Sequence, residues 1–186
     1  MIQIILNTND HYSATEMAQT AIEAGCGWLI MPDVSSDELR ETVPTLVELC
    51  RESGTILTII DNIEAAKEYG LHGVLLTAGH NPAQVRQEIG AEAIIGAEIF
   101  SIDTATALAG ADIDYYAITP DKTVIATEAK TMKIPVHFVA LLGDEVPTAE
   151  LIADLRSKGV DGICMGSKIF DYDDADARIA RLLKEE

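Results

Sequence analysis

Residues 55–76 read TILTIIDNIEAAKEYGLHGVLL and contain one complete unit of strand, helix and strand. Thr55–Ile60 and Gly73–Leu76 are short apolar runs of strand length, without strict alternation of apolar and polar residues. Such runs are typical of parallel strands that are buried on both faces. The helix-patterned segment between them ends at Gly70, a residue that is favoured just after a helix.

The same unit repeats along the whole chain. Apolar runs alternate with helix-patterned segments at Ile2–Leu6, Trp28–Met31, Thr55–Ile60, Gly73–Leu76, Ala93–Phe100, Tyr115–Thr119, Val136–Leu142 and Gly162–Met165. This alternation predicts an α/β fold, a closed (β/α)8 or TIM barrel. A doubly wound open sheet shares the alternation and is the alternative.

The length limits what such a barrel can carry. Barrels of this kind usually need about 250 residues, with about 200 near the lower end. With 186 residues, we expect 1–186 to form one unusually short domain without long lids.

The segments between the runs carry apolar stripes at helical spacing. Two clear stripes are Leu39, Val43, Leu46, Val47 and Cys50, and Ala175, Ile179, Leu182 and Leu183. Ser35 and Glu38 have capping-box spacing at the start of the second helix. Pro44 falls inside that helix and is expected to kink it or to restart it after Thr42.

The composition restricts the classes of partner. A net charge of −18 and a pI near 4.4 argue against nucleic acids and anionic membranes, because no basic surface is present to release counterions. Cys26, Cys50 and Cys164 form no CxxC pair, which favours buried thiols in a reducing compartment over disulfides or zinc. We expect neither a signal peptide nor a membrane span, and a cytoplasmic location.

In parallel barrels the functional residues follow the carboxyl ends of the strands. Of the 13 basic residues, this rule places only Lys122 and Lys168 at the mouth. Loops after the seventh and eighth strands commonly bind phosphate through backbone N–H groups. We therefore expect phosphate to be bound by Gly143, Gly166, Ser167 and Lys168; the alternative is that Gly166 and Ser167 only form a tight turn.

Polar residues after the third, fourth and fifth strands are candidates for metal binding and proton transfer. Asp61 is a candidate magnesium ligand, or else the cap of the helix that begins at Asn62 or Ile63. Glu98 is a candidate acid or base if it points into the mouth, and otherwise a solvated loop residue. His80 would meet Asp61 if the fold brings their two loops together.

The remaining histidines have no convincing chemical role. His11 lies on the functional face with no nucleophile beside it, and His72 falls on the opposite, stabilising face. His137 comes early in the seventh run and is expected to be a buried, hydrogen-bonded group. Neither a Ser-His-Asp triad nor a Cys-His pair can be argued.

Collinear motifs over most of the chain resemble the thiamine phosphate synthase and TenI family. Residues 59–76, IIDNIEAAKEYGLHGVLL, are similar to the family's I-I-N-D-x-x-x-x-A-x-x-x-G-A-x-G-V-H-L, and residues 94–96, IIG, to I-I-G-x-S-x-H. Residues 114–120, DYYAITP, resemble D-Y-I-x-x-G-P, and residues 139–143 resemble A-I-G-G-I. Residues 159–169, GVDGICMGSKI, resemble G-A-x-G-V-A-V-x-S-A-I.

The resemblance implies an activity and roles for several residues. The family's synthase joins a pyrimidine pyrophosphate to a thiazole phosphate with magnesium, forming thiamine phosphate and releasing pyrophosphate. By position, Asp61 matches a magnesium-binding aspartate and Gly143 a glycine of the phosphate loop. Gly166 and Ser167 match the phosphate-binding end of strand eight.

The chain also departs from the family's pattern. Residues 30–34 read IMPDV where the family has Q-L-R-x-K, so the Gln, Arg and Lys that hold the pyrimidine pyrophosphate are missing. Residues 77–80 read TAGH in place of G-Q-x-D, and Glu98 with Phe100 replaces the Ser and His of the strand-five motif. Lys122 is the only remnant of the T-x-T-K loop, and Thr119 with Pro120 stands where TenI-type tautomerases use a histidine.

These features together predict a thiamine phosphate synthase-like barrel that binds a small phosphorylated metabolite and has slow or no synthase turnover. One alternative is a TenI-like enzyme that acts on another phosphorylated metabolite, with Glu98 or His80 as acid or base. Another is a non-catalytic ligand-binding or regulatory barrel. The sequence leaves a homo-oligomer open, since Trp28, Tyr115 and Tyr116 fit either the core or a subunit interface.

Overall fold

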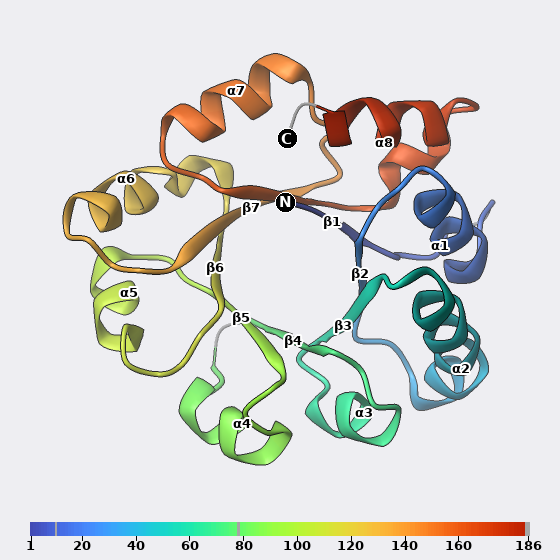
Figure 1. Cartoon of the computed structure of the whole chain (residues 1–186), viewed down its shortest axis with the longest axis horizontal. Coiled ribbons are helices and arrows are strands. Elements are labelled where there is room, and N and C mark those ends of the chain that lie inside the picture. Colours follow the sequence, from blue (N-terminus) through green and yellow to red (C-terminus); the bar gives the residue numbers. More distant parts are fainter. Residues whose placement is uncertain (10, 78, 185–186) are drawn as a thin grey trace.

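The computed structural model describes residues 1–9, 11–77 and 79–184. Within these residues, parallel strands are hydrogen-bonded in the order β1 to β8, and β8 pairs with β1, so the sheet closes on itself. Figure 1 shows the ring of strands end on, with the helices around its outside. The predicted (β/α)8 barrel is confirmed, and the open sheet is excluded because the ring has no unpaired edge strand.

The strands match the predicted runs to within one or two residues. They are β1 (Ile2–Ile5), β2 (Trp28–Met31), β3 (Ile56–Ile60), β4 (Gly73–Leu76), β5 (Ile94–Glu98), β6 (Tyr115–Ile118), β7 (His137–Gly143) and β8 (Gly162–Met165). The difference that matters for the site is at β5, which ends at Glu98 rather than at Phe100.

A helix follows each strand. The helices are α1 (Ala14–Glu23), α2 (Ser36–Ser53), α3 (Ile63–Glu68), α4 (Pro82–Ile89), α5 (Ile102–Leu108), α6 (Val124–Thr131), α7 (Ala149–Ser157) and α8 (Ala175–Lys184). Short 3₁₀ turns, η1 (Pro120–Lys122) and η2 (Ser167–Asp171), precede α6 and α8.

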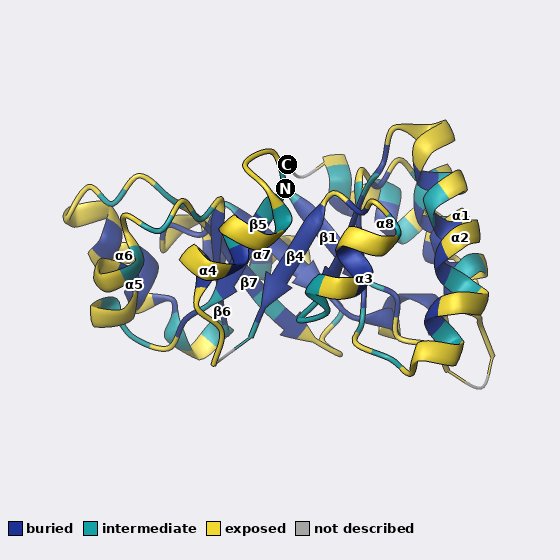
Figure 2. Ribbon diagram, turned by 90° about the horizontal axis from the view of Figure 1, so that it is seen from below, coloured by how far each residue is buried: buried dark blue, intermediate teal, exposed yellow. Residues whose placement is uncertain are grey.

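Each strand is apolar on both sides because it lies between the interior of the ring and the helices. Leu29, Ile59 and Val74 belong to the large cluster that packs the strands against the helices. Their neighbours Ile30 and Leu75 belong to a smaller cluster inside the ring. Figure 2 shows the buried strands flanked by helices whose outer faces are exposed.

Two aromatic side chains fill the amino-terminal part of the ring. Trp28 and Tyr115 pack edge to face, with ring centroids 5.6 Å apart and an interplanar angle of 85°. A Cβ built at Gly96 would lie 2.2 Å from the Tyr115 ring. The glycine of the IIG motif is therefore required by this ring. Tyr116 packs outside the barrel against Phe138, so these aromatic residues belong to the core.

The second helix is longer than its sequence pattern predicts. The Ser35 hydroxyl accepts a hydrogen bond from the Glu38 N–H (3.3 Å), as expected for a cap. The helix then continues past Pro44, so the predicted restart after Thr42 is wrong. Pro44 is exposed, and the buried stripe that includes Val43 and Leu46 holds the helix on the sheet on both sides of the proline.

One histidine is placed differently from its prediction. The His137 side chain is 73% exposed, and its Nδ1 lies 3.7 Å from Asp161. It begins β7 at the rim of the ring, where the strand has not yet entered the core. The prediction of a buried His137 is therefore wrong.

The three cysteines are buried thiols that form no disulfide with one another, as expected. Burial raises the pKa of the Cys50 thiol to about 11 and that of the Cys164 thiol to about 12. Both are therefore uncharged thiols at neutral pH. Separately, no helix in the described part of the chain is long and apolar enough to cross a membrane.

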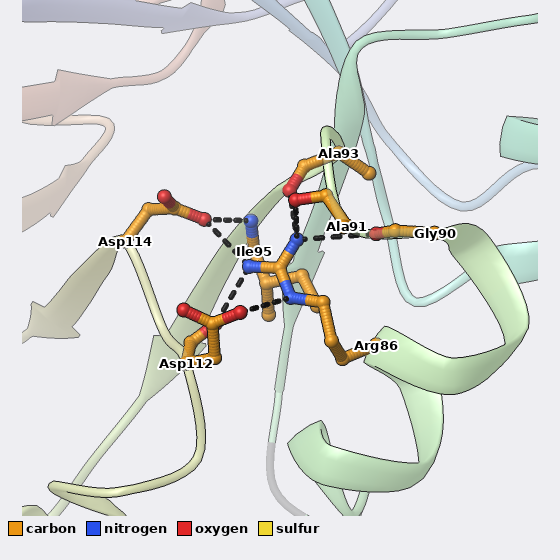
Figure 3. Close-up of polar contacts among 7 residues, drawn as sticks. All are labelled: Arg86, Gly90, Ala91, Ala93, Ile95, Asp112 and Asp114. Carbon is orange, nitrogen blue, oxygen red and sulfur yellow. Dashed lines mark hydrogen bonds and ion pairs between the residues drawn. The ribbon is translucent and has the colours of Figure 1, made fainter.

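Arg86 on α4 ties together two loops at the amino-terminal end of the barrel (Figure 3). Its side chain is 12% exposed, and its guanidinium contacts the Asp112 carboxylate at 3.4 Å and the Asp114 carboxylate at 3.0 Å. Asp114 also accepts a hydrogen bond from the Ile95 N–H (2.8 Å), at the start of β5. The other acceptors of the guanidinium are the carbonyls of Gly90, Ala91, Ala93 and Asp112. Arg86 therefore positions the entry of both β5 and β6.

Replacing Arg86 by Lys should lower the free energy of unfolding by about 2–4 kcal/mol, because one ammonium group cannot reach all of these acceptors and leaves several unpaired. Urea unfolding followed by circular dichroism measures the change. Arg51, which pairs only with Glu48 on the surface, is the matched control. Arg51→Lys should change stability by less than about 0.5 kcal/mol. Equal losses in the two variants would contradict the role given to Arg86.

Candidate active site

The polar residues predicted at the mouth all lie at the carboxyl ends of the strands. Asp61 directly follows β3, and Glu98 is the last residue of β5. Gly143 ends β7, and Ser167 follows β8 after a single residue. They form two groups, one over β3 to β5 and the other over β7 and β8.

Asp61 is fixed by the neighbouring strand. Its backbone N–H donates to the Leu75 carbonyl (3.0 Å), and its carboxylate accepts hydrogen bonds from the Thr77 N–H (2.7 Å) and the Thr77 hydroxyl. Asn62 caps α3, because its side chain accepts from the Ala65 N–H (2.9 Å). The alternative role of Asp61 as the helix cap is therefore wrong. Thr77 was not given a role by sequence reasoning, although it is the first residue after the fourth run.

The fold does bring the loops after β3 and β4 together. The His80 Nε2 atom lies 3.2 Å from Asp61 Oδ1, and the two side chains are 33% and 24% exposed. Asp61 therefore joins a hydroxyl, an amide and an imidazole at one point of the mouth. A carboxylate in contact with one ring nitrogen orients the imidazole and leaves the other nitrogen available for proton transfer.

Glu98 points toward the same part of the mouth. Along β5, Ile94 packs with the cluster inside the ring and Ile95 with the cluster outside it, so Glu98 falls on the interior side by alternation. Burial and, to a smaller extent, the charge of Asp61 raise the pKa of the Glu98 carboxyl above its usual value. A carboxyl group with a raised pKa is the type of group that serves as a general acid or base near neutral pH.

The arrangement around Asp61 does not form a ready metal site. Both carboxylate oxygens already accept hydrogen bonds from Thr77, and His80 Nε2 lies against one of them. Among the described residues, no group of three or more His, Cys, Asp or Glu side chains is placed to hold a metal ion. These residues do not fit magnesium as they stand.

At the other side of the mouth, β7 and β8 are locked together through their last residues. The Gly166 N–H donates to the Gly143 carbonyl (2.8 Å). A Cβ built at Gly166 would lie 2.8 Å from that same oxygen. Glycine at 166 is therefore required by strand packing, and its amide is already used. The first amides of η2, those of Ser167 and Lys168, have no acceptor inside the turn and can face an anion.

A hollow of about 270 Å³ adjoins this end of the mouth. It is lined by Asn9, His11, Asp144, Ser167, Lys168 and Asp171. Neither Asp61 nor Glu98 lines it. The structure thus places the phosphate candidates Ser167 and Lys168 around one hollow, and the acid–base candidates at a separate group.

The charge of the mouth is dominated by carboxylates. Lys168 Nζ lies 2.7 Å from Asp171, and Lys122 Nζ lies 3.4 Å from Asp121. The hydrogen bond to Asp171 raises the pKa of Lys168, so this lysine stays charged but is largely neutralised. Within the described residues, both mouth lysines are therefore paired with acids. One exposed apolar side chain, Phe100, lies on the loop after β5 and is 51% exposed.

Comparison with known proteins supports the resemblance. The profile of the family described as thiamine monophosphate synthase matches residues 2–145. A thiamine-phosphate synthase from Bacteroides thetaiotaomicron is 29% identical over an alignment covering 98% of this chain and 95% of that protein. One from Pyrococcus furiosus is also 29% identical, over 86% of this chain and 82% of that protein.

Solved structures agree with the fold. The thiamine phosphate pyrophosphorylase from Pyrococcus furiosus superposes with a TM-score of 0.76 and 24% identity, over 99% of this chain and 94% of that one. An orotidine 5'-phosphate decarboxylase from Pyrococcus horikoshii superposes with a TM-score of 0.75 but only 12% identity, which shows the barrel alone. By its sequence over nearly its full length, the chain belongs to the thiamine monophosphate synthase family.

Proposed function

We propose that this protein is a thiamine phosphate synthase-like barrel that binds a thiazole phosphate at the β7–β8 side of its mouth and condenses it with a pyrimidine pyrophosphate slowly or not at all. The observation that carries the proposal is the hollow lined by Ser167 and Lys168, in a chain that belongs to the synthase family. Gly143 and Gly166 do not line that hollow, but the hydrogen bond between them holds together the two strand ends next to it.

Several features support one phosphate monoester as the ligand. The first amides of η2, which have no acceptor inside the turn and no side-chain cap, can serve as hydrogen-bond donors, and Ser167 adds a hydroxyl. Lys168 adds a positive charge at the rim, although its pairing with Asp171 weakens that contribution. A monoester needs only a few donors, and this side of the mouth supplies them.

A pyrophosphate is less well accommodated. It carries several negative charges, and the opposite side of the mouth presents Asp61 and Glu98. The positions that carry Gln, Arg and Lys in the family's motif hold Ile30, Pro32 and Val34 here, none of which is charged. Repulsion between the pyrophosphate and these carboxylates is therefore not offset by protein cations.

Magnesium would bind here only together with a bound phosphate group. Asp61 is the residue that the family pattern would assign to it. Because Asp61 accepts two hydrogen bonds from Thr77 and contacts His80, an ion at its oxygens would compete with these contacts. We therefore assign magnesium no step in the reaction.

A second function is favoured by the contact between His80 and Asp61. An imidazole oriented by a carboxylate, with Glu98 nearby, is suited to moving a proton on a bound phosphorylated ring compound. In this reading the protein is a TenI-like enzyme that acts on another phosphorylated metabolite. The third hypothesis is a barrel that binds the ligand without catalysing a reaction. Turnover measurements distinguish it from the synthase and from the TenI-like enzyme.

The synthase reading is tested by measuring binding and turnover on the same purified protein. We expect thiazole phosphate to bind, by isothermal titration, and thiamine phosphate to form well below about 1 per second, the lower end of ordinary enzyme rates. Ser167→Asp should abolish binding, because it places a carboxylate at the anion site. Lys168→Ala should weaken binding only severalfold, since Asp171 already neutralises this lysine.

Circular dichroism checks that both variants remain folded. Ser167 is a better test position than Gly166, where any side chain would collide with the Gly143 carbonyl. Unchanged affinity in Ser167→Asp would show that the β8 exit is only a turn. Turnover at 1 per second or faster would show that the missing cations are dispensable.

The acid–base reading predicts exchange of a carbon-bound proton. Phosphorylated thiazoles and pyrimidines incubated with the protein in D₂O should incorporate deuterium, as followed by proton NMR. His80→Gln and Glu98→Gln should each slow this exchange by about 100-fold or more, the usual contribution of a general acid or base. His137→Gln, at the opposite rim of the barrel, is the control and should exchange at the wild-type rate. No exchange with any of these compounds would rule this reading out for them.

A pH profile adds a readout of the Glu98 environment. Because burial and Asp61 raise the Glu98 pKa, a reaction that uses Glu98 as base should rise as pH passes through that raised value. Asp61→Asn removes the neighbouring charge and should move the rise to lower pH. A profile that does not move would show that Glu98 is not the base.

A further inference from the structure

A second hollow lies outside the mouth, between the start of α7 and the face of α8. Its volume is about 250 Å³. Figure 1 shows α7 and α8 as neighbours in the outer ring of helices. The lining residues are Val146, Pro147, Thr148, Ala149, Ile169, Arg178, Arg181 and Leu182. None of them lines the hollow at the mouth, so the two are separate places on the molecule.

The walls of this second hollow are apolar and its edge is cationic. Val146, Ile169 and Leu182 provide the apolar surface. Arg178 and Arg181 lie three residues apart on α8, which places them on the same helix face. A ligand here would therefore meet hydrocarbon on one side and guanidinium groups on the other.

The charges at this edge do not cancel. Arg178 donates to the Asp174 carboxylate (2.6 Å) and stacks over the Tyr172 ring at 4.0 Å. The pKa of Asp174 lies below its usual value, first because of Arg178 and to a smaller extent because of Arg181. Arg181 forms no ion pair with any other described residue. Two guanidinium groups thus share one carboxylate.

The lack of a described ion-pair partner for Arg181 contrasts with other arginines of the protein. The chain carries a net charge of −18. Arg40 pairs with Asp37, Arg51 with Glu48, and Arg86 with two aspartates. An arginine that pairs with no other described residue, beside an apolar hollow in so acidic a chain, therefore favours an anionic ligand.

The helix terminus at this hollow does not account for anion binding by itself. The Thr148 hydroxyl accepts from the Leu151 N–H (3.2 Å). Hydrogen bonds from its own amide and from Thr148 hold the pKa of Glu150 below its usual value, so a carboxylate of the protein already satisfies the start of α7. The arginine pair is the remaining anion-binding feature.

We infer that this hollow binds a small amphipathic anion, in which a carboxylate or phosphate contacts Arg181 and Arg178 and a compact apolar body fills the space beside Val146, Ile169 and Leu182. The site is independent of the proposed function at the mouth. It shares η2 with the phosphate side, because Ile169 belongs to the same turn as Ser167 and Lys168.

Four probes separate the contributions of charge and apolar body. Benzoate and phenyl phosphate carry both, inorganic phosphate carries charge alone, and benzyl alcohol carries the ring alone. Titrations followed by ¹H–¹⁵N NMR should show saturable shifts of the amides of Val146, Ala149 and Ile169 with benzoate or phenyl phosphate. Whichever of benzoate and phenyl phosphate binds more tightly shows whether the site prefers a carboxylate or a phosphate. Inorganic phosphate and benzyl alcohol should bind at least about tenfold more weakly, since each loses one of the two contacts.

Two variants test the assignment, and two serve as controls. Arg181→Gln should weaken binding about tenfold through loss of the charged hydrogen bond. Ala149→Trp should abolish binding by filling the hollow, and the position is exposed, so the fold should persist. Arg51→Gln removes an exposed arginine elsewhere and should change nothing. Ser167→Asp should also leave benzoate binding intact, which separates failure here from failure at the mouth.

Three results would overturn the inference. The first is the absence of saturable shifts at Val146, Ala149 and Ile169 with either anion. The second is equal binding of benzyl alcohol and benzoate, which would remove the role of charge. The third is unchanged affinity in Arg181→Gln, which would remove the role of the unpaired arginine.

Discussion

The closure of the sheet, in which Gln3 of β1 pairs with Cys164 of β8, is the constraint on which the rest of this structure depends. Closure leaves no edge strand, and it gathers the carboxyl ends of all the strands into one ring. Residues more than a hundred positions apart, such as Asn9 and Asp171, thereby come within hydrogen-bond distance at 3.4 Å. Closure also fixes how much can fit inside. The interior accepts Tyr115 only because Gly96 on the neighbouring strand has no side chain.

Much of this architecture follows from local sequence. Runs that are apolar on both faces, and the glycines after the helices, specify parallel strands and their helices, which is why the barrel could be predicted. Features that depend on the balance between local preferences and tertiary packing could not be predicted from the sequence. Pro44 opposes the helix locally, but the buried stripe on the other side outweighs it. His137 lies within an apolar run, yet it is the first residue of its strand and remains at the rim.

The candidate site was predictable in its location but not in its pairings. Position after a strand is enough to place Asp61, Glu98 and Ser167 at the mouth. The sequence does not reveal which of these polar groups already form contacts within the protein. Those contacts decide which groups remain available to a ligand. The Asp61 carboxylate accepts a hydrogen bond from Thr77 and contacts His80, and the Gly166 amide donates to the Gly143 carbonyl. Membership of the synthase family and a mouth lined with acids are therefore compatible: the fold follows the family, whereas the side chains on the β3–β5 side of the mouth have their own arrangement.

The backbone at Asp61 has a further consequence. Its φ angle is 55°, in the left-handed region that a residue with a side chain occupies at a cost of roughly 1 kcal/mol or more. The hydrogen bonds from Thr77 hold it there. Glycine would relax this strain, but it would also remove the carboxylate that gathers Thr77 and His80. Hydrogen bonds to a charged group contribute about 1.5–3 kcal/mol each, more than the strain costs, so the left-handed backbone at Asp61 persists only while Thr77 holds the carboxylate. A change at Thr77 would therefore release the backbone of the β3–β4 side of the mouth as well as one of its side chains.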